Sequence, residues 1–262
     1  MRSALFFDID GTLIDSYHDV REVSPAVRAE LARLREAGHA LVLSSGRPPV
    51  LLDAGLLELG FDALICINGG YVEVAGTPVH EQRMGRALAR RTLDFCRGLG
   101  CEYEFVCADG LYTAPDNVGF IEFFSHVGDV FDFDFDEDEL LDRVIKFETL
   151  LDASERDRVT ALARSELGSQ ISVDSHGGAG TFELYPTAIS KATGVEVVLE
   201  RLGIDRAHSY AFGDGTNDLE MIEACGCGVA MGNAEDEVKA VADIVCGPVW
   251  DDGLAEVLRT LL

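Results

Sequence analysis

The chain carries few positive charges. Its 21 lysines and arginines stand against 47 aspartates and glutamates, which gives a formal net charge of -26. Because the phosphates of nucleic acids and of anionic lipids attract basic surfaces, this charge argues against nucleic-acid binding and against membrane binding. A phosphorylated ligand would also be repelled at long range, so a site for one must provide local positive charge or a metal ion.

Long apolar segments are also missing. No segment approaches the roughly 20 apolar residues that span a bilayer, and Asp8 interrupts the first apolar run too early for a signal peptide. The seven cysteines are an odd, scattered set, and Cys225-Gly-Cys227 lacks both zinc-site spacing and a second pair. We therefore expect reduced thiols and a cytoplasmic protein, whose 47% hydrophobic residues suffice for a full core.

Two motifs are incomplete. The alternating aspartates from Asp132 to Asp138 look like the start of a calcium loop, but the sixth-position glycine and the terminal glutamate are absent. The interleaved phenylalanines Phe131, Phe133 and Phe135 instead indicate a half-buried strand with a solvated acidic face. The glycine-rich segment at 177–180 lacks the lysine and the hydroxyl of a phosphate-binding P-loop.

Strand and helix patterns alternate at both ends of the chain. Short apolar runs at 4–7, 39–43 and 63–67 predict strands, and helical patterns at 25–37 and 48–59 lie between them. The alternation resumes later, with predicted helices at 189–202, 218–224 and 251–262 and predicted strands at 208–212, 228–231 and 243–246. This order predicts an α/β fold with a Rossmann-like parallel sheet.

The middle of the chain follows a different pattern. Helices predicted at 85–99 and 154–167, the second capped by Ser154, are each followed by paired strands. Helices followed by antiparallel strands describe an α+β module. We expect a split core formed by residues 1–82 and 186–262, with an inserted α+β cap domain at 83–185.

Two aspartates follow the first predicted strand. Asp8 and Asp10 would lie at its carboxyl end, where open α/β sheets bind their ligands. Two carboxylates this close favour a divalent cation between them. Asp8 could act as a nucleophile in phosphoryl transfer, and Asp10 as the acid and base. The alternative is a polar turn between strand and loop.

Three further segments supply matching chemistry. Gly213-Asp214-Gly215-Thr216-Asn217-Asp218 follows another predicted strand, and its carboxylates suit magnesium. Ser45 and Gly46 offer a hydroxyl and free backbone N–H groups for a phosphoryl oxygen. Lys191, one of only three lysines, begins a predicted helix, where the helix dipole disfavours it, and could neutralise a transferring phosphoryl group. The alternative for Lys191 is an ordinary surface lysine.

Together these motifs resemble the haloacid dehalogenase-like phosphohydrolases, specifically the Cof-type members with a type IIB cap. The resemblance rests on Asp-x-Asp-Gly-Thr at 8–12, Ser-Ser-Gly-Arg at 44–47, Ile-Ser-Lys at 189–191 and Gly-Asp-Gly-Thr-Asn-Asp at 213–218. Asn-Gly-Gly at 68–70 and Ala-Met-Gly-Asn-Ala at 230–234 also match this subfamily. The matches extend over the whole chain.

The resemblance implies a role for each motif residue. Asp8 would be phosphorylated and Asp10 would be the acid/base. Mg²⁺ would be held by the Asp8 side chain, the Asp10 backbone carbonyl and Asp214, with Asp218 nearby. The groups that would hold the phosphoryl group are the Ile9 backbone N–H, Ser45, Gly46, Lys191 and Asn217. Serine at position 45 departs from the commoner threonine but keeps the hydroxyl.

The substrate is less defined by the sequence. Arg47, Asn68, Asp174 and His176 are candidate substrate contacts, and Arg47 could equally brace its loop. We expect a magnesium-dependent hydrolase of small phosphorylated metabolites, such as sugar phosphates, pyridoxal phosphate or flavin-pathway phosphates. A phosphomutase or phosphotransferase, or a non-catalytic phosphometabolite-binding protein, is the alternative, and the protein would be a monomer or homodimer.

Overall fold

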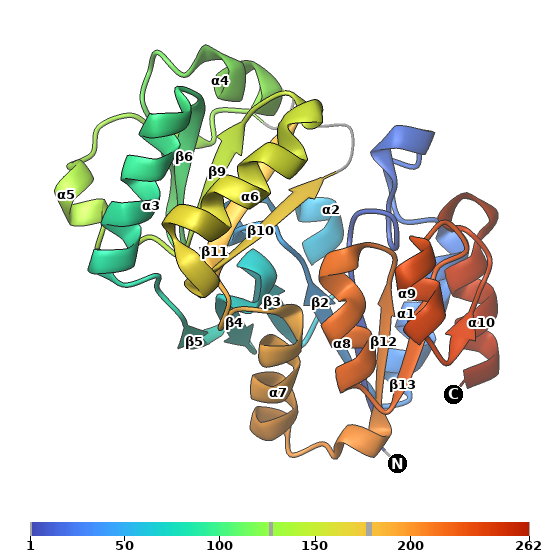
Figure 1. Ribbon diagram of the computed structural model, residues 1–262. Coiled ribbons are helices and arrows are strands. Elements are labelled where there is room, and N and C mark those ends of the chain that lie inside the picture. The colour runs from blue at the N-terminus through green and yellow to red at the C-terminus, as the bar shows by residue number, and fades with distance from the viewer. Residues whose placement is uncertain (1, 126–127, 177–179, 262) are drawn as a thin grey trace. The chain divides into compact units, whose positions relative to one another are not determined.

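The computed structural model describes residues 2–125, 128–176 and 180–261, and the chain divides into two compact units (Figure 1). Unit 1 comprises residues 1–46, 52–80 and 190–262, and unit 2 comprises 47–51 and 81–189. The predicted insert at 83–185 falls within residues 81–189 of unit 2, with which the short segment 47–51 also groups.

Unit 1 is built on an eight-stranded sheet with the strand order β14-β13-β12-β1-β2-β3-β4-β5. The strands are β1 (Ala4–Phe7), β2 (Ala40–Ser44), β3 (Ala63–Cys66), β4 (Tyr71–Val74), β5 (Thr77–Glu81), β12 (Ser209–Gly213), β13 (Cys227–Ala230) and β14 (Ile244–Val245). The six strands from β14 to β3 are parallel, and β4 pairs with β3 in the antiparallel direction. This confirms the predicted parallel sheet.

Strand β1 lies inside the sheet of unit 1, and all of its residues are apolar. All four of its side chains are fully buried, as are those along β2, because helices cover both faces of a parallel sheet. Phe7 lies opposite Phe212 of β12, and the two rings stack with centroids 4.9 Å apart. The polar residues that follow β1, β2 and β12 therefore emerge at one edge of the sheet.

The helices of unit 1 are α1 (Pro25–Glu36), α2 (Ala54–Leu57), α7 (Lys191–Leu202), α8 (Leu219–Ala224), α9 (Asp236–Val241) and α10 (Gly253–Leu261). The start of α1 is as predicted, since Ser24 Oγ accepts a hydrogen bond from the Val27 N–H. The single helix predicted at 48–59 is wrong. A 3₁₀ turn (Pro49–Leu51) ends before Asp53, whose side chain caps α2. Helix α9 was not predicted.

Unit 2 contains a six-stranded sheet with the order β10-β11-β9-β6-β7-β8. The strands are β6 (Glu102–Cys107), β7 (Gly110–Thr113), β8 (Phe131–Asp132), β9 (Lys146–Leu150), β10 (Ile171–His176) and β11 (Thr181–Pro186). Its helices are α3 (Arg86–Leu99), α4 (Val118–Phe124), α5 (Glu137–Leu140) and α6 (Arg156–Glu166). Residues 177–179, most of the glycine-rich segment considered as a P-loop, lie outside the described chain.

One face of this second sheet carries the hydrophobic core. Phe105, Phe147 and Phe182 point into a cluster with residues of α3 and α6, such as Leu93 and Val159. Because side chains alternate along a strand, the intervening residues lie on the opposite face. That face carries charged residues that are nevertheless buried: Glu104, Lys146, Glu148 and Glu183.

Three details of unit 2 differ from the sequence predictions. The strand expected from the phenylalanines at 131–135 shrinks to Phe131–Asp132, because Asp136 caps α5 through the N–H groups of Asp138 and Glu139. The helix expected from Ser154 begins at Arg156, and the preceding 3₁₀ turn is capped by Asp152 instead. Helices α4 and α5 were not predicted.

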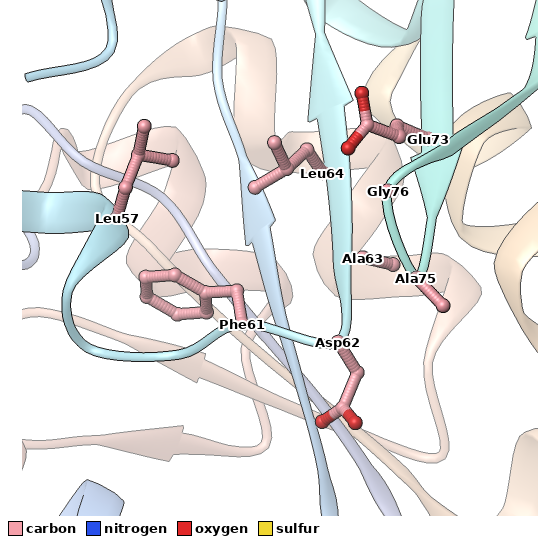
Figure 2. Close-up of a pocket in the computed structure, with 8 residues that line it drawn as sticks. All are labelled: Leu57, Phe61, Asp62, Ala63, Leu64, Glu73, Ala75 and Gly76. Atoms are coloured by element: carbon pink, nitrogen blue, oxygen red, sulfur yellow. The ribbon is translucent and has the colours of Figure 1, made fainter. Parts of the chain in front are cut away.

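A small cavity of about 170 Å³ lies in unit 1 at the amino end of β3 (Figure 2). Leu57, Phe61 and Leu64 line it together with Glu73, while Asp62 accepts a hydrogen bond from the Leu41 N–H at 2.9 Å. The cavity is thus at the opposite end of β3 from the polar turn that follows Cys66. All seven cysteines are unpaired, and within the described ranges no helix is long and apolar enough to cross a membrane.

Candidate active site

Three carboxylates converge where β1 and β12 end. Asp8 follows β1, and Asp214 and Asp218 belong to the loop and 3₁₀ turn that follow β12. The parallel pairing of the two strands continues one residue further, because the Asp8 N–H donates to the Phe212 carbonyl at 3.0 Å. One oxygen from each carboxylate lies within 4.8 Å of the others, in the sole grouping of this kind within the described residues. Asp8 and Asp218 are buried and Asp214 is half-buried.

Crowding and burial disfavour the ionised forms of these acids. Burial, followed by the charge of Asp218, raises the pKa of Asp8 to about 7 even though Lys191 acts in the opposite direction. Burial, followed by the charges of Asp8 and Asp218, raises the pKa of Asp214 to about 9. A divalent cation would relieve this repulsion and lower both pKa values. Hard carboxylate oxygens at this spacing fit magnesium, the metal expected from the sequence.

Lys191 is the positive charge of this cluster. It is the first residue of α7, whose start is fixed by a reciprocal capping box between Ser190 and Thr193. Its Nζ donates to Oδ1 of Asp8 at 2.5 Å and to Oδ1 of Asp218 at 2.6 Å, and the side chain is fully buried. Burial lowers the pKa of Lys191, but the two carboxylates outweigh it and the net shift is upward. Lys191 is therefore no ordinary surface lysine.

Asp218 has both carboxylate oxygens engaged. Oδ1 accepts from Lys191, and Oδ2 accepts from the N–H groups of Asp214 and Gly215 at 3.0 and 3.1 Å. Gly213 leaves the room for this, since a Cβ there would lie 2.6 Å from Cβ of Asp218. Asp218 thus holds the loop that carries Asp214.

Gly11, which follows Asp10, lies so close to the Asp214 carboxylate that no side chain would fit there. Gly11 has φ +87°, and a Cβ there would lie 2.0 Å from Oδ2 of Asp214. Thr12 Oγ1 donates to Asp214 Oδ1 at 3.4 Å, and the Asn233 amide donates to the Gly11 carbonyl at 2.8 Å. Asn233 belongs to the segment at 230–234 that the resemblance includes, yet its bracing role was not predicted.

Asp10 differs from Asp8 in its surroundings. Its side chain is exposed and is not part of the three-carboxylate group. Its backbone continues from Ile9, which is fully buried and whose carbonyl accepts hydrogen bonds from the N–H groups of Thr12, Leu13 and Ile14. The Asp10 side chain is therefore open to solvent, unlike that of Asp8.

The turn after β2 corrects one expectation. The backbone N–H of Ser45 was expected to be available for a phosphoryl oxygen, but it donates to the Ile65 carbonyl at 2.8 Å. The pairing of β2 with β3 continues one residue past Ser44, which uses up this donor. Ser45 itself is buried, and its carbonyl accepts from the Asn68 N–H at 3.0 Å.

Asn68 connects three segments of unit 1. It is buried in a left-handed conformation with φ 52°, and its Oδ1 accepts from the Asn217 amide at 3.3 Å. A Cβ on Gly46 would lie 2.9 Å from the same Oδ1. Asn68, Gly46 and Asn217 therefore lie together. Gly69, with φ +99°, approaches the Ser190 carbonyl so closely that a Cβ there would lie 2.0 Å from it.

The remaining predicted substrate contacts belong to unit 2. Arg47 groups with it, and Asp174 is half-buried on β10 and accepts a hydrogen bond from the Tyr185 hydroxyl. Asp174 also lines an open hollow of about 580 Å³ beside α6, together with Arg164. His176 ends β10, and its side chain lies outside the described part of the chain.

Comparison with known proteins decides the family. The model of the haloacid dehalogenase-like hydrolases matches residues 5–258. The chain belongs to this family. "Putative phosphatase YkrA" of Bacillus subtilis is 33% identical over 264 residues, covering 98% of this chain and 96% of the relative.

Two further comparisons extend over the whole chain. The 5-amino-6-(5-phospho-D-ribitylamino)uracil phosphatase YitU of the same organism is 28% identical, with 96% of this chain and 94% of the relative covered. Among solved structures, the subclass IIB sugar phosphatase BT4131 has a TM-score of 0.85 at 23% identity, with 98% of both chains covered. The fold is that of this subclass, and the chain is a phosphatase of the haloacid dehalogenase-like family.

Proposed function

We propose that this phosphatase hydrolyses small phosphorylated metabolites with Mg²⁺, through an aspartyl-phosphate on Asp8. The observation that carries the proposal is the contact of Lys191 Nζ with Asp8 Oδ1 inside a three-carboxylate group. A carboxylate held by a buried ammonium at the carboxyl end of β1 is a positioned nucleophile. The names of YkrA and YitU support a phosphate-ester substrate.

The chemistry proceeds in two displacements. An oxygen of Asp8 forms a bond to phosphorus while the ester bond breaks, and Asp10 gives its proton to the departing oxygen. Asp10 then takes a proton from water, whose oxygen bonds to phosphorus as the bond to Asp8 breaks, which restores both residues and releases phosphate. Lys191 supplies positive charge for the phosphoryl oxygens, and Ser45, Gly46, Asn217 and the Ile9 N–H are proposed donors to them.

The proposed metal residues are the Asp8 side chain, the Asp10 carbonyl and Asp214, with Asp218 holding the loop of Asp214 in place. Magnesium bound there would neutralise charge on the phosphoryl group and keep Asp8 ionised. The raised pKa values of Asp8 and Asp214 support this, because a carboxyl that holds its proton near neutral pH is a poor nucleophile without a cation.

A single experiment tests the intermediate. The enzyme is mixed with p-nitrophenyl phosphate and MgCl₂, quenched in acid and digested, and the peptides are analysed by mass spectrometry. We expect the phosphoryl group on the peptide that contains Asp8, and none with Asp8→Asn or with excess EDTA. Turnover without a phosphopeptide, or turnover in Asp8→Asn, would refute the mechanism. Adding a free sugar would show whether the phosphoryl group goes to water or, as in a mutase, to a hydroxyl.

A further inference from the structure

The last residue of β2 carries a buried hydroxyl group without a hydrogen-bond partner. Ser44 is fully buried, and its Oγ makes no hydrogen bond with any residue in the described part of the chain. Buried side-chain hydroxyls are nearly always paired, because burial removes the hydrogen bonds that water would otherwise provide. The proposed mechanism uses Ser45 and Gly46 of the same segment, so it leaves the Ser44 hydroxyl without a role.

The register of the sheet places Ser44 beside Asp8. Phe7 of β1 pairs with Leu43 of β2, so Asp8 and Ser44 occupy the next position along these two parallel strands. Side chains at the same position of neighbouring strands project from the same face of a sheet, because the direction alternates along every strand. The Ser44 hydroxyl and the proposed nucleophile are therefore neighbours on one face.

Helix α7 covers this face of the sheet. On its other side Ser44 pairs with Ile65 of β3, and a Cβ on Gly194 of α7 would lie 2.4 Å from Cγ2 of Ile65. The same helix begins at Lys191, whose Nζ donates to Asp8 Oδ1 at 2.5 Å. Ser44 is thus enclosed beside the contact between the lysine and the nucleophile. In such a buried place a single hydrogen bond is electrostatically stronger than in water.

The proposed reaction changes what the Asp8 carboxyl group needs. In the structure, Lys191 donates to Asp8. During the second displacement Lys191 shares its charge with the phosphoryl oxygens, while negative charge returns to the Asp8 oxygen that leaves phosphorus. A donor that faces this oxygen would stabilise the charge as it develops. The hydroxyl of a serine turns between staggered positions about the Cα–Cβ bond, so Ser44 can reach an oxygen that it does not contact at rest.

We propose that the Ser44 hydroxyl donates a hydrogen bond to the Asp8 oxygen that leaves phosphorus, and so accelerates hydrolysis of the aspartyl-phosphate. The inference rests on the proposed function. In this step the oxygen of water bonds to phosphorus, the bond from phosphorus to Asp8 breaks with its electron pair on Asp8, and Asp10 takes the proton of water. Ser44 keeps its own proton. The first displacement gains no such help, because a donor to the free carboxylate stabilises the reactant and not the transition state.

A single-turnover experiment separates the two displacements. Enzyme in excess over p-nitrophenyl phosphate is mixed with MgCl₂ and quenched in acid at short intervals. Release of p-nitrophenol reports the first displacement, and decay of the phosphorylated Asp8 peptide reports the second. We expect Ser44→Ala to slow the decay by about 10- to 100-fold, the effect of one hydrogen bond to a charged oxygen, and to leave p-nitrophenol release within about threefold. Equal decay rates in the variant and in wild type would overturn the inference.

Ser209 provides a matched control in the same sheet. It is also a buried serine, at the start of β12, but its hydroxyl donates to the Arg206 carbonyl at 2.6 Å and accepts from the Gly226 N–H at 3.0 Å. Ser209→Ala should lower the thermal midpoint by about 2 to 4 °C and leave both displacements unchanged. Ser44→Ala should not lower the midpoint, because it breaks no hydrogen bond of the resting protein. A lower midpoint with unchanged kinetics would assign Ser44 a structural role and overturn the inference.

A second variant distinguishes hydrogen bonding from packing. A thiol is a weaker donor than a hydroxyl, so Ser44→Cys should give a decay rate between those of wild type and Ser44→Ala. Decay slower than in Ser44→Ala would indicate a packing defect and contradict the inference. The proposed function is judged separately, by whether a phosphorylated Asp8 peptide forms at all. Its absence from both wild type and Ser44→Ala would refute the proposed function and the inference together, whereas its presence with unchanged decay would refute the inference alone.

Discussion

The two units each bury a lysine among carboxylates, and the two clusters differ in what surrounds the charge. Lys191 of unit 1 contacts Asp8 and Asp218, and Lys146 of unit 2 contacts Glu183 and Glu148. In both, burial lowers the lysine pKa and the carboxylates more than restore it. Both clusters also hold a further carboxyl whose pKa is raised.

The difference lies in how the carboxylates are held. In unit 1 they stand on loops at strand ends and converge within 4.8 Å, as a small hard cation requires. In unit 2 they project from the middle of neighbouring strands, at the spacing of the sheet, and form a row. A point of convergence suits a metal and a phosphoryl group, whereas the row in unit 2 spreads its negative charge along the sheet with Lys146 among the carboxylates.

The largest expected effect comes from Asp8. Asp8→Asn keeps the shape but removes the nucleophile, so kcat for p-nitrophenyl phosphate should fall by about 10⁴-fold or more. Steady-state rates with Mg²⁺ measure this, and circular dichroism checks the fold. Glu148→Gln likewise replaces a carboxylate with an amide, but in the cluster of unit 2. The amount of phosphorylated Asp8 peptide should be the same in this variant as in wild type. Comparable losses of chemistry in both variants would erase the distinction between the clusters.

The two lysines allow a direct comparison of stability. Lys191→Met and Lys146→Met each leave buried carboxylates without their ammonium, and each should cost about 3 to 5 kcal/mol of unfolding free energy. Magnesium should restore part of the loss in Lys191→Met, because a cation replaces a cation, and none in Lys146→Met. Urea denaturation with MgCl₂ and with EDTA measures both. An equal response of the two variants to magnesium would contradict the metal assignment.

The sequence anticipated one cluster and missed the other, for a physical reason. Asp8, Asp214 and Lys191 follow or begin recognisable elements, and parallel strands bring their carboxyl ends to one edge, so adjacency could be predicted. Glu104 and Glu148 are single residues in alternating strands, far apart in the chain. Only the antiparallel register places them side by side, and nothing in local spacing encodes that register.

The errors in local structure have the same origin. The predicted helix at 48–59 breaks because Asp53 accepts the Leu56 N–H and starts a new helix, and the predicted cap Ser154 instead donates its N–H to Asp152. An aspartate competes with the helix through its own side chain, but the sequence does not show which aspartate does so. The Ser45 N–H was misassigned because strand pairing extends one residue further than the apolar pattern.

A third prediction separates the clusters by pH. In EDTA, the raised pKa values of Asp8 (about 7) and Asp214 (about 9) mean that the folded protein keeps protons that the unfolded chain releases near pH 4. This stabilisation is complete below about pH 4 and declines as the pH rises from there, until the pH has passed the folded-state pKa values of about 7 and then about 9. Magnesium competes with those protons and should flatten the decline. Urea midpoints from pH 6 to 9 with and without the metal measure it.

Glu104 adds a decline of the same sign, since its pKa is also raised, but with no metal dependence. The part of the slope that persists in magnesium should therefore diminish in Glu104→Leu. If magnesium abolished the pH dependence of stability entirely in wild type, all of that dependence would come from the carboxylates of unit 1. Glu104 would then be neutralised within its own cluster.

The smallest effect concerns the hydroxyl of Ser45. Ser45→Ala should raise KM for phosphate esters by about 10-fold, the value of one hydrogen bond to a charged group, whereas Ser45→Thr keeps the hydroxyl and should remain within about twofold. The buried position makes the extra methyl of threonine the principal risk. Because the Ser45 N–H already serves β3, the hydroxyl is the donor by which this residue can reach a phosphoryl oxygen. Equal KM values for Ser45→Ala and wild type would show that the Ser45 hydroxyl does not contact the phosphoryl group. Lys191 would then neutralise the phosphoryl charge without it.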